Sequence, residues 1–402
     1  MKKLSKFGED FLLLALRINK DIKEYVDFYY GPEKLRQIAD NEILTSPNKL
    51  LKDLIAINYQ LGAQGYSKER ERYLEKLLTA MKTSIEILNG AEIPIKEQYL
   101  RIYDVDLKPA NDFELDNFKD DVDKAYPGSG SLEERLAKIR VIRKVPEVNV
   151  LTFFKKALNI VRKQTNLLFT NLLPEEEHIT IDLVEKTDDK IKWSYYNWYL
   201  GNYHSRIEVN PKFAMYWTSF LSAASHEGYP GHHTEFVLNE RILNREQNHF
   251  EHSILLLHSP KLVICEGIGD IAINVLFSYK KSAEISMQEL CPFSLKEESL
   301  EELIAQNEVK GKVSLFWYNL AYHALIDNWD IEKLTRYAQY YEMYSVESIN
   351  NQLKLINNPT HSLTAFSYNL GSNLIIKKYG EFPSVKNFRF LLENPTLPSD
   401  LL

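Results

Sequence analysis

Residues 225–233 read Ser-His-Glu-Gly-Tyr-Pro-Gly-His-His and stand near the middle of the 402-residue chain. The apolar run before them, residues 216–224, indicates a buried helix that carries His226 and Glu227 inward. The helical zinc motif has His, Glu, two residues and His, because side chains four residues apart share one helix face. Pro230 takes the position of that second histidine, so the usual register is broken.

The second ligand must therefore come from His232 or His233. On an unbroken helix His232 would be rotated by about 240° from His226, and His233 would lie roughly 10 Å further along the axis. Neither could share a zinc ion whose nitrogen ligands sit about 2.0–2.1 Å from the metal. Pro230 disfavours the helix and Gly231 tolerates unusual backbone, so we expect a bulge that brings in His232, with His233 as the alternative.

The third ligand is expected to be Glu266, which lies in an apolar stretch that indicates a buried helix. A buried carboxylate is costly unless something pairs with it, and a metal ion would do so. Gly267 and Gly269 would let this helix approach the motif helix closely. Asp270, one turn after Glu266, either accepts the free N–H of a ligand histidine or is a helix-face acid with a salt-bridge partner.

Three ligands of these types suit one catalytic zinc ion per chain, which keeps a fourth position for water and lowers its pKa towards about 7. Manganese or cobalt could occupy the same site. Glu227 would face the water as general base and then pass its proton to the leaving amine.

The same residues carry a resemblance to a known family. Residues 226–233 resemble the His-Glu-x-x-Pro-Gly-His-His signature of domain-of-unknown-function family 885, a zincin-like family regarded as metallopeptidases. In that family Leu-Gln usually follows, and Glu-Gly-Trp-Ala comes later in the chain. Here Thr234-Glu235 and Glu266-Gly267-Ile268-Gly269 stand at those places. The resemblance covers about residues 150–380 and implies a large helical, gluzincin-type fold.

The resemblance also implies two donors for the developing oxyanion. Tyr368 is similar to the tyrosine of a late family segment, Gln-Ala-x-x-Tyr-x-x-Gly, although Thr364 replaces the glutamine. His323 resembles the histidine of a further segment. Each residue has a simpler interpretation, Tyr368 as a packing tyrosine and His323 as a core histidine bonded to a carbonyl.

Residues 178–184, 192–196 and 205–210 read as strands and predict one small antiparallel sheet beside the metal motif. An edge strand there could bind a peptide by strand addition, or the sheet could be purely structural. Tyr203 and Arg206 are candidates for binding a substrate carboxylate, because arginine can do so with two hydrogen bonds.

Helical periodicity covers nearly all of the remainder, including one helix expected over residues 6–30. Helix starts are expected at Ser46-Pro47, at Ser67 and at a capping box formed by Ser131 and Glu134. The predicted class is mainly α, with an N-terminal helical region (1–172) and a catalytic region (173–402) that form one continuous unit. His249, His252 and His258 invite a second metal site but are expected to be solvated surface residues.

Composition excludes several function classes. The net charge of −7 is mild and no basic block suggests nucleic-acid binding. Two cysteines make no disulfide framework, and no run approaches the roughly 20 apolar residues of a membrane span. We therefore expect a cytoplasmic zinc peptidase acting on small peptides, without a nucleic-acid or membrane partner. The alternatives are a metal-dependent hydrolase of a non-peptide amide or ester, and a helical scaffold with a vestigial zinc site.

Overall fold

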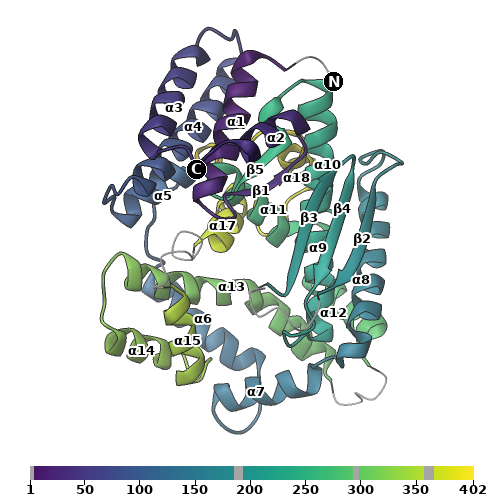
Figure 1. Ribbon diagram of the computed structural model, residues 1–402. Helices are drawn as coiled ribbons and strands as arrows, with labels where there is room; N and C mark the ends of the chain where they lie inside the picture. Colours follow the sequence, from purple (N-terminus) through teal and green to yellow (C-terminus); the bar gives the residue numbers. More distant parts are fainter. Residues whose placement is uncertain (1–3, 185–192, 293–297, 357–365) are drawn as a thin grey trace.

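The computed structural model describes residues 4–184, 193–292, 298–356 and 366–402. The chain is mainly helical, as expected, with two small sheets among the described residues. In Figure 1 the first five helices form the upper left of the molecule, a three-stranded sheet stands at the right, and α9, α10 and α11 lie between them. Helices α6, α7, α13, α14 and α15 form the lower part.

The N-terminal half begins most of its helices where the sequence predicts. Ser67 caps α4 by accepting from the Arg70 N–H, Pro47 is the first residue of α3, and Ser131 and Glu134 form the expected capping box of α7. The helices are α1 (Lys6–Asp21), α2 (Glu33–Asn41), α3 (Pro47–Leu61), α4 (Lys68–Leu88), α5 (Ile95–Tyr103), α6 (Asp112–Ala125), α7 (Leu132–Arg143) and α8 (Glu147–Leu168).

The single helix expected over residues 6–30 is wrong. Helix α1 ends at Asp21, Ile22 is extended, and Glu24 has a positive φ of 61°. The chain continues as β1 (Val26–Tyr29), which pairs antiparallel with β5 (Ile254–Leu256). The pairing partner lies more than two hundred residues away in sequence, so local periodicity could not indicate it.

The expected small sheet contains β2 (His178–Leu183), β3 (Tyr195–Gly201) and β4 (His204–Val209) in the order β2-β4-β3. Strands β3 and β4 form an antiparallel hairpin, as predicted. Strand β2 instead pairs parallel with β4, because β4 inserts between the two strands that precede it. Strand β3 is consequently an edge of this sheet.

The C-terminal half surrounds α11, whose side chains are mostly buried. The expected boundary at residue 172 does not divide the core, since the largest apolar cluster takes side chains from α4–α6 and from α11, α13 and later helices. The remaining main helices are α9 (Phe220–Glu227), α10 (His232–Leu238), α11 (Pro260–Leu276), α12 (Tyr279–Ile285), α13 (Leu300–Leu325), α14 (Ile331–Tyr340), α15 (Val346–Ile356), α17 (Ser367–Tyr379) and α18 (Val385–Glu393), with a π-helical turn over Asn239–Glu246.

Among the described residues no single helix is long and apolar enough to cross a bilayer; α11 and α12 meet that test only as a pair, and they are bent by 81°.

Candidate metal centre

The metal motif divides into two short helices. Helix α9 ends at Glu227 and α10 begins at His232, so the chain breaks completely where the sequence predicts a bulge. The Gly231 N–H donates to the Ser225 carbonyl at 2.9 Å, which folds the loop back onto the end of α9. A Cβ at Gly231 would lie 2.1 Å from the His226 carbonyl oxygen, so only glycine fits there. This fold brings His232 beside His226.

His226, His232 and Glu266 come together as the sequence predicts. Each offers a ligand atom, and these atoms all lie within 4.8 Å of one another. Glu266 Oε2 is 3.5 Å from His226 Nε2, and Glu266 Oε1 is 3.9 Å from His232 Nε2. The two rings are nearly perpendicular, with centroids 4.5 Å apart. The three side chains come from α9, α10 and α11.

The donor set fits a zinc ion. Glu266 Oε2 is buried and accepts no hydrogen bond from any described residue, and burial raises the pKa of this carboxyl. Burial lowers the pKa of His232 well below its usual value, which keeps the imidazole neutral as a ligand requires. Burial acts against a charge on His226 too, but contacts with Asp270 and Glu266 raise its pKa. The same negative surroundings favour a metal cation.

Asp270 contacts His226, as one of its two predicted roles requires. Its Oδ1 lies 3.3 Å from His226 Nδ1, so it can fix the orientation of the ring while Nε2 faces Glu266. Gly269 allows this packing, because a Cβ there would lie 2.7 Å from His226 Cε1. Gly267 was also expected to face the motif helix, but it packs against Gly371 of α17.

Replacing Asp270 by Ala should lower zinc affinity by about 10–100-fold, because His226 loses the carboxylate that orients its ring. Competition with a chromophoric chelator measures this affinity. Replacing Glu246, whose side chain is 62% exposed, by Ala is the control and should leave it unchanged. Equal affinities for the native protein and the Asp270 variant would show that Asp270 has no orienting role.

Glu227 lies beside the ligands and is 8% exposed. Burial raises the pKa of its carboxyl to about 7, the charge on His226 lowers it, and the carboxyls of Glu266 and Asp27 add to the increase. The Asn197 side chain of β3 donates to the Glu227 backbone carbonyl at 2.5 Å, which ties the end of α9 to the sheet. A buried carboxyl of this kind suits general-base chemistry.

His233, the alternative ligand, is occupied elsewhere. It is fully buried, its Nε2 lies 2.7 Å from Glu177 Oε2, and its Nδ1 lies 2.8 Å from Ser205 Oγ. The break at residues 228–231 turns it away from the triad, so this alternative is wrong. The Tyr229 hydroxyl also donates to Glu177 Oε2, at 2.6 Å.

Glu177 is a residue that the sequence analysis missed. It precedes β2, its side chain is 4% exposed, and Arg162 donates to its second oxygen at 2.5 Å. Burial acts to raise the pKa of Glu177, but hydrogen bonds from His233 and Tyr229 and the charge of Arg162 leave it lowered. Because Glu177 contacts Tyr229 inside the loop and His233 just after it, Glu177 helps to fix the position of His232. No local sequence pattern marks it.

Replacing Glu177 by Ala should reduce the free energy of unfolding by about 3–5 kcal/mol, because the Tyr229 hydroxyl and His233 lose their buried acceptor. Urea denaturation measures the change. The neighbouring Glu176 is exposed, and its replacement by Ala should change the free energy by less than about 0.5 kcal/mol. Equal stability of the two variants would contradict this role for Glu177.

His323, predicted as an oxyanion donor, is a packed residue of α13. Its ring stacks on Trp329 with centroids 3.8 Å apart, and its Nδ1 lies 2.7 Å from Asp327. It is not among the described residues that line the cleft at the triad, so this assignment is wrong. Tyr368 falls in the first turn of α17, which packs against α11, but its side chain lies outside the described part of the chain.

The proposed substrate residues Tyr203 and Arg206 are also placed away from the cleft. Tyr203 lies at the β3–β4 turn with the Arg245 guanidinium over its ring. Arg206 points to the outer face of β4, where it is 3.2 Å from Glu208. Alternation along β4 puts Ser205 and Ile207 towards the core and Arg206 on the opposite face, so the prediction for both residues is wrong.

The triad opens into a large cleft of about 1300 Å3. His226, Glu227, His232 and Glu266 all line it. Residues of β3 and of the stretch from the end of α1 to β1 also line the cleft, and only β3 belongs to the sheet for which the sequence suggested peptide binding. Other lining residues are Asp21, Glu24, Asp27, Trp193, Tyr195, Tyr196, Asn197, His258, Asp270 and Lys310.

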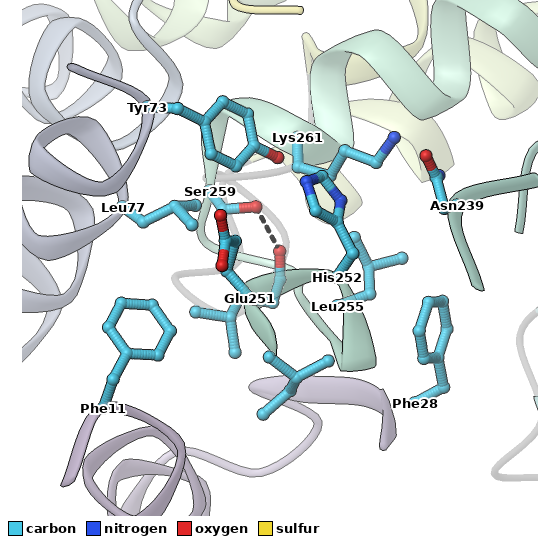
Figure 2. A pocket seen from close by; sticks show the side chains of 12 residues that line it. Phe11, Phe28, Tyr73, Leu77, Asn239, Glu251, His252, Leu255, Ser259 and Lys261 are labelled. Atoms are coloured by element: carbon cyan, nitrogen blue, oxygen red, sulfur yellow. Dashed lines mark hydrogen bonds between the residues drawn. The ribbon is translucent and has the colours of Figure 1, made fainter. Parts of the chain in front are cut away.

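A second group of possible ligands contains His249, Glu251 and His252. Figure 2 shows Glu251, His252 and Lys261 around a cavity of about 10 Å3, which has room for about one water molecule. Arg70 already binds both oxygens of Glu251, at 2.8 and 2.7 Å, so this group fits a metal ion less well than the triad. His252 is 4% exposed, which corrects its expected surface position.

No protein-family model and no curated relative matches the chain. The fold is similar to that of a "putative lipoprotein" from Colwellia psychrerythraea, with a TM-score of 0.53 and 12% identity. That match covers 89% of this chain, which spans 66% of the length of the Colwellia protein. A "putative lipoprotein of unknown function" from Shewanella oneidensis has a TM-score of 0.45 and 12% identity. That match covers 96% of this chain and 83% of the Shewanella protein. The resemblance to family 885 therefore stays a prediction.

Proposed function

We propose that this protein is a zinc-dependent peptidase that cleaves short peptides in the cleft beside the triad. His226, His232 and Glu266 would hold the metal ion, and Glu227 would be the general base. The observation that carries the proposal is the convergence of three donors from three helices next to the buried carboxyl group of Glu227. Two histidines and one glutamate are a known ligand set of catalytic zinc in peptidases.

Zinc bound at this triad would supply a Lewis acid and an activated water for attack on an amide carbonyl. Glu227 takes the proton of the attacking water and passes it to the leaving amine nitrogen. Asp270 holds the His226 ring, and Asn197 fixes the backbone at Glu227, so the base and the ligand keep their relative positions. Burial of Glu227 supports this role, because a base with a pKa near 7 can both accept and return a proton at neutral pH.

The position of β3 supports a peptide as substrate. It is an edge strand, and its residues Tyr195, Tyr196 and Asn197 line the cleft. An extended peptide can pair with such an edge through backbone hydrogen bonds. The cleft volume of about 1300 Å3 suits a short peptide rather than a folded protein.

A mixture of synthetic peptides tests the proposal. The purified protein, given one equivalent of zinc, is expected to release products that mass spectrometry detects. A chelator should abolish the release, and added zinc should restore it. Zinc binding without hydrolysis of any peptide would contradict the proposal and favour a non-peptide amide or ester, or a scaffold role, for the same site.

A further inference from the structure

One wall of the cleft comes from the short segment between α1 and β1. Asp21 at the end of α1, Glu24 in this segment and Asp27 in β1 all line the cleft. The early end of α1 makes this possible, because a helix continued to residue 30 would not cross the opening. The N-terminal part of the chain thereby supplies carboxylates to a site whose metal ligands lie some two hundred residues later.

Asp27 is the member of this group with the most defined environment. It lies on β1, and its Oδ1 accepts a hydrogen bond from the Tyr196 hydroxyl on β3. Burial raises the pKa of the Asp27 carboxyl to about 7, the Tyr196 bond lowers it, and the negative charge of Glu266 raises it further. Among the described residues no lysine, arginine or histidine forms an ion pair with Asp27. Asp27 is half-buried in the wall of the cleft, and a partly buried carboxylate without a cation would be stabilised by a bound cation.

Strand β3 links Asp27 to the triad, because Asn197 follows Tyr196 and donates to the Glu227 backbone carbonyl. The carboxyl groups of the cleft also influence one another. The negative charge of Asp27 raises the pKa of Glu227, and the negative charge of Glu266 raises the pKa of Asp27. Lys310 also lines the cleft, and its interacting carboxylate is Asp270, one helical turn beyond Glu266 on α11. Asp27 and Lys310 therefore line the same cleft as the triad.

We propose that Asp27 binds the free α-ammonium group of a peptide, so that the enzyme removes residues from amino termini. The inference rests on the proposed peptidase function and adds its substrate class. Water is added across the first peptide bond; the released residue carries the new carboxylate, and the shortened peptide carries the new amino group. Asp27 holds the ammonium group of the departing residue, and Tyr196 holds the Asp27 carboxylate in place.

Binding of four forms of tetra-alanine tests the inference. The forms have a free or acetylated amino end and a free or amidated carboxyl end, and calorimetry measures their dissociation constants for the zinc-loaded Glu227→Gln variant. Acetylation should weaken binding by about tenfold or more, because it removes a charge-assisted hydrogen bond. Amidation should change binding less. Asp27→Asn should bring the ratio between acetylated and free forms close to one.

Asp40→Asn is the matched control, since it removes the same charge from an exposed position on α2. It should keep the full preference for the free amino end. The inference would be overturned if the parent variant bound the acetylated and free forms equally. It would also be overturned if only amidation weakened binding, or if no form bound. Cleavage by the native enzyme is measured separately. Ammonium-selective binding without cleavage would remove the peptidase function and keep Asp27 as the ammonium site.

Discussion

Replacing Glu227 by Gln is expected to lower kcat/KM for peptide cleavage by about 10²–10⁴-fold, the usual contribution of a general base. Glutamine has nearly the same shape as glutamate but cannot take a proton from water. The side chain is not one of the three ligands, so the zinc content should stay at that of the native protein. A loss of activity with metal retained separates the base from the ligands.

The measurement compares initial rates for one cleaved peptide, with zinc content determined on the same samples. The Glu246→Gln variant has the same chemical change at a surface position and should keep native rates. Unchanged turnover in the Glu227→Gln variant would mean that proton transfer to Glu227 is not part of the reaction.

Replacing Gly231 by Ala is expected to reduce the free energy of unfolding by about 3 kcal/mol and to abolish stoichiometric zinc binding. The added Cβ would meet the His226 carbonyl oxygen at 2.1 Å and the Ser225 carbonyl oxygen at 2.3 Å. Both contacts are with backbone, which cannot rotate away as a side chain can. The loop must move, and His232, the next residue, moves with it.

Gly311→Ala provides the comparison, because a Cβ there would meet no atom within 4 Å. That glycine lies inside α13, where alanine is favoured by about 0.5–1 kcal/mol, so its replacement should slightly stabilise the protein. Urea denaturation and metal analysis on both variants measure these effects. Native stability and full zinc content in Gly231→Ala would contradict the loop geometry.

The sequence predicted that His226, His232 and Glu266 lie together, because each step depended on local chemistry. Pro230 and Gly231 disfavour a continuous helix, so a bulge that brings in His232 was expected, with His233 as the alternative. Glu266 was predictable because a carboxylate inside an apolar helix requires a partner. Helix starts at Ser67 and Ser131 followed from side-chain caps, which also depend only on neighbouring residues.

The features that the sequence did not reveal depend on distant contacts. The β1–β5 pair joins segments from opposite parts of the chain, and the segment that leads into β1 brings Asp27 to the cleft. Glu177 has no motif around it and is important only because His233 and Tyr229 meet it. His323 and Arg206 carry suitable chemistry, but packing on Trp329 and strand alternation direct them elsewhere.

The most direct test of the account is the zinc content of the native protein, purified without a metal-affinity tag and measured by plasma mass spectrometry beside His226→Ala. The account predicts one zinc ion per native chain and none in the variant, whose triad lacks the side chain of α9. No zinc in the native protein after zinc is added back, or equal zinc in both proteins, would contradict it.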